Sequence, residues 1–169
     1  MIRRQICLTV SCLLLAATAA AQSASQHPNF SGIWKINLEK SDFGRSEAPL
    51  SAEYVIRHLH STLTFDYTQD GNTARTEITP DSEERLTNEN GELQTWTRAH
   101  WSGDELVLEA RQKSRKLNAA AVPVKWTSRW KLSSDRKVLT IQRRINTPMG
   151  DIDQVVVFER QPLPQASKQ

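Results

Sequence analysis

The sequence predicts an all-β protein, a single antiparallel up-and-down β-barrel of about eight to ten strands. Short runs in which apolar and polar residues alternate recur along residues 30–160, as in strands that bury one face. Turn-forming pairs such as Asp70-Gly71 and Asn90-Gly91 separate these runs. The alternation of strands with helical segments that a parallel sheet requires is missing from the sequence.

The N-terminus has the pattern of a secretory signal. Arg3 and Arg4 precede an apolar run at residues 7–17, and Ala19-Ala20-Ala21 provides a small-residue cleavage site. The apolar run is shorter than the ~20 residues of a membrane-spanning helix. We therefore expect export, to the periplasm or to the outside, and no membrane span. The predicted organisation is a signal peptide at 1–21, a flexible leader at 22–29, the barrel at 30–160 and a flexible tail at 161–169.

Cleavage would change both the cysteine content and the charge. Both cysteines, Cys7 and Cys12, lie within the signal, so the barrel would contain neither a disulfide nor a thiol. The two signal arginines would also be removed, which lowers the formal charge of +3 by two. A nearly neutral chain has little electrostatic attraction for a phosphate backbone, and we expect no nucleic-acid partner.

In the first half of the barrel region, apolar residues recur at every second position and predict one buried face per strand. Gly44 and Pro49 predict a loop between the first two strands, and Asp70-Gly71 predicts a hairpin. The predicted faces are Trp34, Ile36 and Leu38; Tyr54, Ile56, His58 and His60; and Leu63, Phe65 and Tyr67. The corresponding strands are 32–38, 52–60, 62–68 and 73–78, with a further short strand possible within 79–88.

The second half continues the pattern. Gly103 and the pair Pro148 and Gly150 predict turns between neighbouring strands. The predicted faces are Leu106, Leu108 and Ala110; Trp126, Ser128, Trp130 and Leu132; and Leu139, Ile141, Arg143 and Ile145. The corresponding strands are 93–101, 106–112, 124–132, 138–145 and 152–160.

Two features resemble the lipocalin and wider calycin group: Gly32-Ile33-Trp34 in the first strand, and Arg160 at the end of the last. In that group the tryptophan closes one end of the barrel and an arginine from a late strand packs across it. The resemblance implies a cation over the Trp34 indole, from Arg160 or alternatively from Arg143 or Arg144.

A closer resemblance is to a family of exported bacterial lipocalin-like proteins that has no assigned activity. It rests on residues 29–44 (NFSGIWKINLEKSDFG) and on the stretch Trp-x-Leu-Ser-x-Asp-x-Lys-x-Leu-Thr-Ile at residues 130–141. It implies the lipocalin-like barrel for nearly the whole chain beyond the signal.

The aromatic residues suggest a cavity for a small hydrophobic or amphipathic ligand. Arg98 is the candidate for binding an anionic head group. The candidate ligand-binding residues are Tyr54, Phe65, Tyr67, Trp96, Arg98, Trp126 and Trp130. The alternative is a filled barrel, a structural or interaction protein of the cell envelope whose aromatic residues form ordinary core.

Catalysis is the less favoured function. The sequence contains no Gly-x-Ser-x-Gly, no His-Glu-x-x-His and no glycine-rich phosphate loop, so we expect no enzyme and no cofactor, although some calycin-like barrels do act on their ligands. His58 and His60 could bind zinc together with His100. The alternative is that these histidines lie near strand ends in water, and we expect no metal.

Overall fold

The structure is a computed structural model that describes residues 27–114 and 124–162. The predicted signal peptide, residues 22–26 of the predicted leader and residues 163–169 of the predicted tail lie outside the described residues. Ten strands are found in the described part: β1 (Gly32–Ile36), β2 (Ala52–Leu59), β3 (Thr62–Gln69), β4 (Asn72–Ile78), β5 (Glu84–Asn90), β6 (Leu93–Ser102), β7 (Glu105–Ser114), β8 (Val124–Leu132), β9 (Val138–Thr147) and β10 (Gly150–Gln161).

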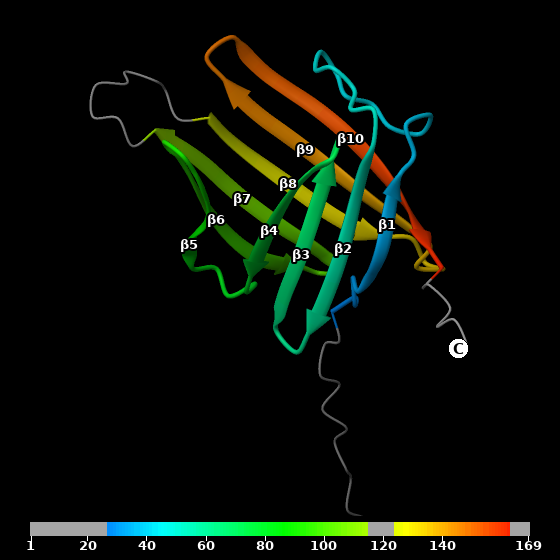
Figure 1. Ribbon diagram of the computed structural model, residues 1–169. Coiled ribbons are helices and arrows are strands. Elements are labelled where there is room, and N and C mark those ends of the chain that lie inside the picture. Colours follow the sequence, from blue (N-terminus) through cyan, green and yellow to red (C-terminus); the bar gives the residue numbers. More distant parts are fainter. Residues whose placement is uncertain (1–26, 115–123, 163–169) are drawn as a thin grey trace, which may run out of the picture.

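The strands form one antiparallel sheet that curls into a nearly closed barrel (Figure 1). Each strand pairs with its neighbours in the chain, except that β4 and β5 do not pair with each other, and β1 also pairs with β10, which joins the first and the last strand. The sheet ends at β4 and β5, which approach each other without pairing as neighbours. The predicted fold class, an all-β up-and-down barrel of lipocalin-like type, is confirmed.

The expected strands all form and differ from their predicted bounds by at most two residues at either end. The strand left open within 79–88 is β5, which begins at Glu84. The hairpin at Asp70-Gly71 forms as predicted, because both residues adopt the positive φ angles, 49° and 83°, that a tight hairpin turn needs.

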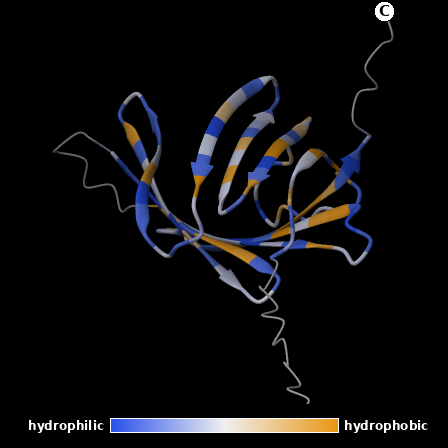
Figure 2. Ribbon diagram, turned by 90° about the horizontal axis from the view of Figure 1, so that it is seen from below, coloured by the Kyte–Doolittle hydropathy of each residue, from blue (hydrophilic) through white to orange (hydrophobic). Residues whose placement is uncertain are grey.

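Apolar residues alternate with polar ones along the strands, as Figure 2 shows. Most of the apolar residues are buried in the core of the barrel. The side chains that are fully buried gather towards the end of the barrel at which β1 begins and β10 ends, here named the closed end. They are Trp34, Trp130, Phe30, Phe158, Leu63, Leu106, Leu139 and Ile141. The barrel is therefore solid at one end, and free space is left in the middle and towards the other.

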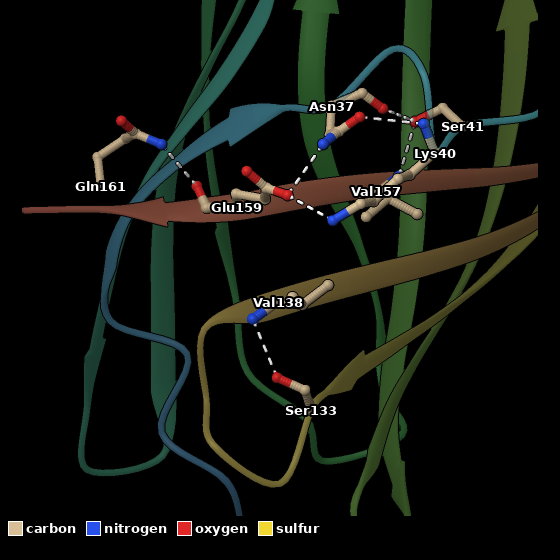
Figure 3. A network of polar contacts seen from close by, with 8 residues as sticks. All are labelled: Asn37, Lys40, Ser41, Ser133, Val138, Val157, Glu159 and Gln161. Atoms are coloured by element: carbon tan, nitrogen blue, oxygen red, sulfur yellow. Dashed lines mark hydrogen bonds and ion pairs between the residues drawn. The ribbon is translucent and has the colours of Figure 1, made fainter.

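The segment at residues 37–51, between β1 and β2, lies at the opposite end and is tied to β10. Figure 3 shows Glu159 accepting hydrogen bonds from Asn37 and Lys40, both at 2.9 Å, and the Ser41 hydroxyl accepting one from the Val157 amide, also at 2.9 Å. Further along, Arg45 donates to the carbonyls of residues 149 and 150. These bonds hold the segment across the β9–β10 hairpin.

Among residues 27–114 and 124–162, no helix is long and apolar enough to cross a membrane.

Candidate ligand-binding cavity

A cavity of 360 Å³, here named the main cavity, occupies the middle of the barrel. Its volume is at the lower end of the range of about 300–1,000 Å³ found for small-molecule sites. It is lined by side chains of β2 to β9 that alternate with outward-facing ones. The lining residues are Tyr54, Phe65, Thr76, Ile78, Thr87, Asn88, Asn90, Leu93, Thr95, Thr97, Leu108, Ala110, Gln112, Trp126, Ser128, Trp130 and Arg143.

A smaller space of 160 Å³, here named the upper chamber, lies under the segment at 37–51. Phe43 and Pro49 from that segment form part of its lining, together with Tyr67. Tyr54 and Arg143 line both spaces. These two side chains therefore lie at the junction between the main cavity and the upper chamber.

One wall of the main cavity is aromatic. The ring of Tyr54 lies 5.7 Å from that of Phe65 and 5.1 Å from that of Trp130, and Phe65 and Trp130 are 5.4 Å apart, measured between ring centroids. These edge and tilted contacts fix the rings against one another. The Trp130 indole N–H is buried and has no hydrogen-bond partner among the described residues.

Arg143 is a half-buried cation on the inner face of β9. Its cross-strand neighbours are Ser128 on β8 and Gln154 on β10, both buried and uncharged. Its Nε donates to the Ser128 hydroxyl at 3.3 Å. No carboxylate of the described residues lies within ion-pair distance of it, whereas the next residue, Arg144, makes two bonds of 2.7 and 2.9 Å to Asp153 on the outer face.

The two tyrosines beside Arg143 are held in the neutral form. Burial raises the pKa of Tyr54 to about 12, and the charge of Arg143 offsets part of that rise. Burial also raises the pKa of Tyr67, again opposed by Arg143. At neutral pH both groups are therefore protonated, and the Tyr67 hydroxyl donates to Gln69 at 2.8 Å. The upper chamber is also lined by Glu47, which is exposed.

Two of the predicted ligand-binding residues lie elsewhere. Trp96 and Arg98 are on the outer face of β6, because Thr95 and Thr97, which alternate with them, line the main cavity. The Arg111 guanidinium lies 5.3 Å from the centroid of the Trp96 ring. The expectation that Arg98 faces the cavity is wrong, whereas Tyr54, Phe65, Trp126 and Trp130 line the main cavity and Tyr67 the upper chamber.

The closed end has the contact that the resemblance implied. The guanidinium carbon of Arg160 lies 4.3 Å from the centroid of the Trp34 ring. Arg160 also donates to the carbonyls of Ser31 and Arg136 at 2.7 and 2.8 Å, and the Trp34 indole donates to the carbonyl of Phe30 at 2.9 Å. Of the three arginines considered, Arg160 is the one that packs on Trp34.

His100 does not join His58 and His60, which line a common pocket with His27. His58 faces the closed end, where its Nδ1 accepts the Phe30 amide at 3.4 Å, while His60 is in the β2–β3 turn at φ 55°. His100 lies on the other face of β6 from the core residue Ala99. Within the described ranges, no group of three histidine, cysteine or acidic residues is placed to hold a metal ion.

Sequence reasoning missed Arg143 as a cavity residue, although a signal was present. Arg143 occupies a position on the predicted face of Leu139, Ile141 and Ile145, and an arginine on an otherwise apolar face is unusual unless it has a function. Ser128 was visible in the same way, as a small polar residue between Trp126 and Trp130. The amides that β5 contributes gave no comparable signal.

The fold is shared with lipid-binding barrels of known structure, at very low sequence identity. A structure named REP1-NXSQ fatty acid transporter is 11% identical, with a TM-score of 0.55 over 79% of this chain and 96% of the other. Zebrafish ileal bile acid-binding protein, in complex with cholic acid, is 9% identical, with a TM-score of 0.57 over 78% and 98%. Lipid binding protein 8 of Caenorhabditis elegans is 14% identical, with a TM-score of 0.56 over 78% and 95%. No protein-family model and no curated protein sequence matches the chain.

Proposed function

We propose that the protein binds a small amphipathic anion in the barrel without transforming it, with the anionic group at Arg143 and the apolar part in the main cavity. The observation that carries this proposal is the half-buried guanidinium of Arg143, which has no carboxylate partner in the described residues. Arginine keeps its proton at any physiological pH, and a cation removed from water without a counter-ion is costly. A ligand carboxylate, sulfate or phosphate would supply that counter-ion.

The surrounding groups support the same ligand class. The neutral hydroxyl of Tyr54 adds a donor beside the guanidinium, as anion recognition requires, whereas the Tyr67 hydroxyl already donates to Gln69 at 2.8 Å. The aromatic wall formed by Phe65 and Trp130 provides apolar surface, whose burial contributes about 25 cal/mol per Å². The names of the three structures above, which refer to fatty acid, bile acid and lipid, agree with an amphipathic ligand.

Isothermal titration with dodecanoic acid and with dodecanol tests the proposal. We expect the acid to bind, and Arg143→Met to weaken its binding about tenfold or more while affecting the alcohol much less. Arg144→Met is the matched control, because Arg144 is adjacent in sequence and faces outward. Equal losses in the two variants, or acid binding that is insensitive to Arg143→Met, would contradict the assignment.

We further propose that this binding takes place outside the cytoplasm, on the strength of the secretory pattern at residues 1–21. The N-terminal sequence of protein recovered after expression in a bacterium tests it, and we expect cleavage after Ala21. Recovery of the chain with an intact N-terminus would contradict export.

A further inference from the structure

The wall of the main cavity that β4, β5 and β6 form is mostly polar and is uncharged, in contrast to the aromatic wall described above. We name it the polar wall. Ile78 and Leu93 are its two apolar residues, and its polar side chains are those of Thr76, Thr87, Asn88, Asn90, Thr95 and Thr97. Because β4 and β5 are the unpaired ends of the sheet, the polar wall lies where the barrel is not closed by backbone hydrogen bonds.

A β-bulge sets which side chains of β5 belong to this wall. Leu86 pairs with Trp96 and Asn88 pairs with Thr95, so that Thr87 is an extra residue in the ladder. Beyond the bulge the alternation is shifted by one, which turns Asn88 and Asn90 inward. Glu89 lies on the outer face, where it accepts a hydrogen bond from Gln94. A regular strand would place Glu89 inside instead, and bulges commonly re-aim side chains in this way near functional sites.

The amides of the polar wall have unused hydrogen-bonding capacity. Thr87 and Thr97 satisfy each other through a bond of 2.8 Å between their hydroxyls. By contrast, the side chains of Thr76, Asn88 and Asn90 make no hydrogen bond to any of the described residues. Each amide can donate twice and accept. Thr76 and Asn88 are half-buried, and Asn90 at the rim is exposed. An alkyl chain laid against Thr76 and Asn88 would exclude water from these two groups and leave them without partners.

We propose that Asn88 and Asn90, with Thr76, form a second polar subsite that binds an uncharged hydroxyl or carbonyl group of the ligand. The inference rests on the proposed function, since it places this group at the end of the ligand remote from the anion at Arg143. Arg143 is on β9 and Asn88 on β5, four strands apart around the sheet. The ligand class is thus an amphipathic anion oxygenated at its far end, in preference to a plain alkyl carboxylate.

The expected preference for an oxygenated ligand comes from the cost of unpaired polar groups in the subsite. A site that can hydrogen-bond a ligand hydroxyl discriminates strongly against the analogue that lacks it, because its own polar groups are then left unpaired. The subsite is only partly buried, so the expected discrimination is modest, about five- to tenfold in the dissociation constant.

The test is a calorimetric comparison of decanoic, dodecanoic and tetradecanoic acids with their ω-hydroxy derivatives, on the purified protein. We expect the hydroxy acid to bind about five- to tenfold more tightly for at least one chain length. The double substitution Asn88→Leu and Asn90→Leu should abolish this preference while keeping or improving the binding of the plain acid. Glu89→Gln, on the outer face of the same strand, is the matched control and should keep the preference.

Plain-acid binding with no gain from the hydroxyl at any length would overturn the subsite and leave the proposed function standing. A gain that survives the double substitution would also overturn it. Failure of every acid to bind the unaltered protein would instead overturn the proposed function itself. If the double variant does not fold, Thr76→Val replaces it, and the comparison on the unaltered protein still decides.

Discussion

The Arg160 side chain packs over the Trp34 ring at the closed end, with its guanidinium carbon 4.3 Å from the centroid of the indole ring. The two residues are also direct partners in the β1–β10 ladder. The same guanidinium bonds the carbonyls of Ser31, just before β1, and of Arg136, in the β8–β9 turn. One side chain therefore connects the first strand, the last strand and the β8–β9 turn at the closed end.

Arg160→Met should lower the free energy of unfolding by about 2 kcal/mol. The substitution keeps the apolar stem but removes the cation–π contact and two hydrogen bonds from a charged donor. The free energy of unfolding of Arg160→Lys should lie between those of the unaltered protein and Arg160→Met, since lysine retains the charge but not the forked geometry of the guanidinium. Urea unfolding followed by tryptophan fluorescence measures the effect, and Arg160→Met as stable as the unaltered protein would refute the closing role.

Gly32→Ala should be more costly than an ordinary glycine substitution, by about 1–3 kcal/mol in the free energy of unfolding. Gly32 has φ 149°, and an added Cβ would lie 2.9 Å from Nη1 of Arg160. Gly103→Ala is the matched control, because Gly103 also has a positive φ, 64°, but has no atom within 4 Å of an added Cβ. Equal losses of unfolding free energy in Gly32→Ala and Gly103→Ala would mean that backbone conformation alone accounts for the cost, and that the contact with Arg160 contributes nothing.

The fold could be predicted because its signal is local and repeated. Leu63, Phe65 and Tyr67 alternate cleanly with polar residues, and a strand with one buried face has no other arrangement. Asp70-Gly71 fixed one hairpin through the φ angles that only such residues adopt easily. β5 was harder, because its sequence ERLTNEN is polar at nearly every position and its strand character comes from pairing with β6.

The cavity could be predicted only where one face of a strand is clearly the larger and more apolar. Residues 93–101 have no such face, because Trp96 alternates with threonines and Trp101 lies on the opposite side. The prediction assumed that the aromatic Trp96 faces inward, and this assumption also placed Arg98, two residues further along the strand, inside the barrel. The bulge at Thr87 gave no sequence signal at all, since a one-residue shift in register depends on the paired strand. Asn88 and Asn90 therefore became cavity residues only in three dimensions.

Acid should destabilise the protein through His58. Burial lowers the pKa of His58 below its ordinary value of 6.5, so the folded protein favours the neutral ring, whose Nδ1 accepts the Phe30 amide. For a group whose pKa is lowered on folding in this way, the stabilising contribution is present above pH 6.5 and is lost as the pH falls below that value. Carboxylates in ion pairs, such as Asp66 with Arg75, have lowered pKa values and titrate further down.

The measurement for His58 is the urea midpoint as a function of pH. In the unaltered protein it should be flat above pH 6.5 and decline below it, and His58→Gln should show a smaller decline. Glutamine can still accept the Phe30 amide but does not titrate. His60→Gln, in the exposed β2–β3 turn, is the control for the loss of a histidine side chain near the same end of the barrel. Parallel profiles for the unaltered protein and His58→Gln would exclude His58 as the titrating group.

Alkali should destabilise the protein through Tyr54, which lies with Arg143 at the junction between the main cavity and the upper chamber. Burial raises its pKa to about 12 from an ordinary value of 10.0, so folding favours the protonated hydroxyl. The stabilising contribution is therefore present below pH 10 and is lost as the pH rises towards about 12. The chain has only two tyrosines, Tyr54 and Tyr67, so tyrosinate absorbance resolves both.

In that titration Tyr67 should ionise before Tyr54, and Tyr54→Phe should leave one step at the lower pH. Arg143→Met should move the ionisation of Tyr54 further upward, because the guanidinium charge opposes the effect of burial, while Arg144→Met should leave it in place. The unaltered protein and all three variants are followed by circular dichroism, so that ionisation is read only while the barrel is folded. A Tyr54 that ionises near pH 10 in the folded protein would show that its hydroxyl is not held in the neutral form by burial. A Tyr54 whose ionisation is indifferent to Arg143→Met would show that Arg143 is not beside its hydroxyl, and would remove a donor from the proposed anion site.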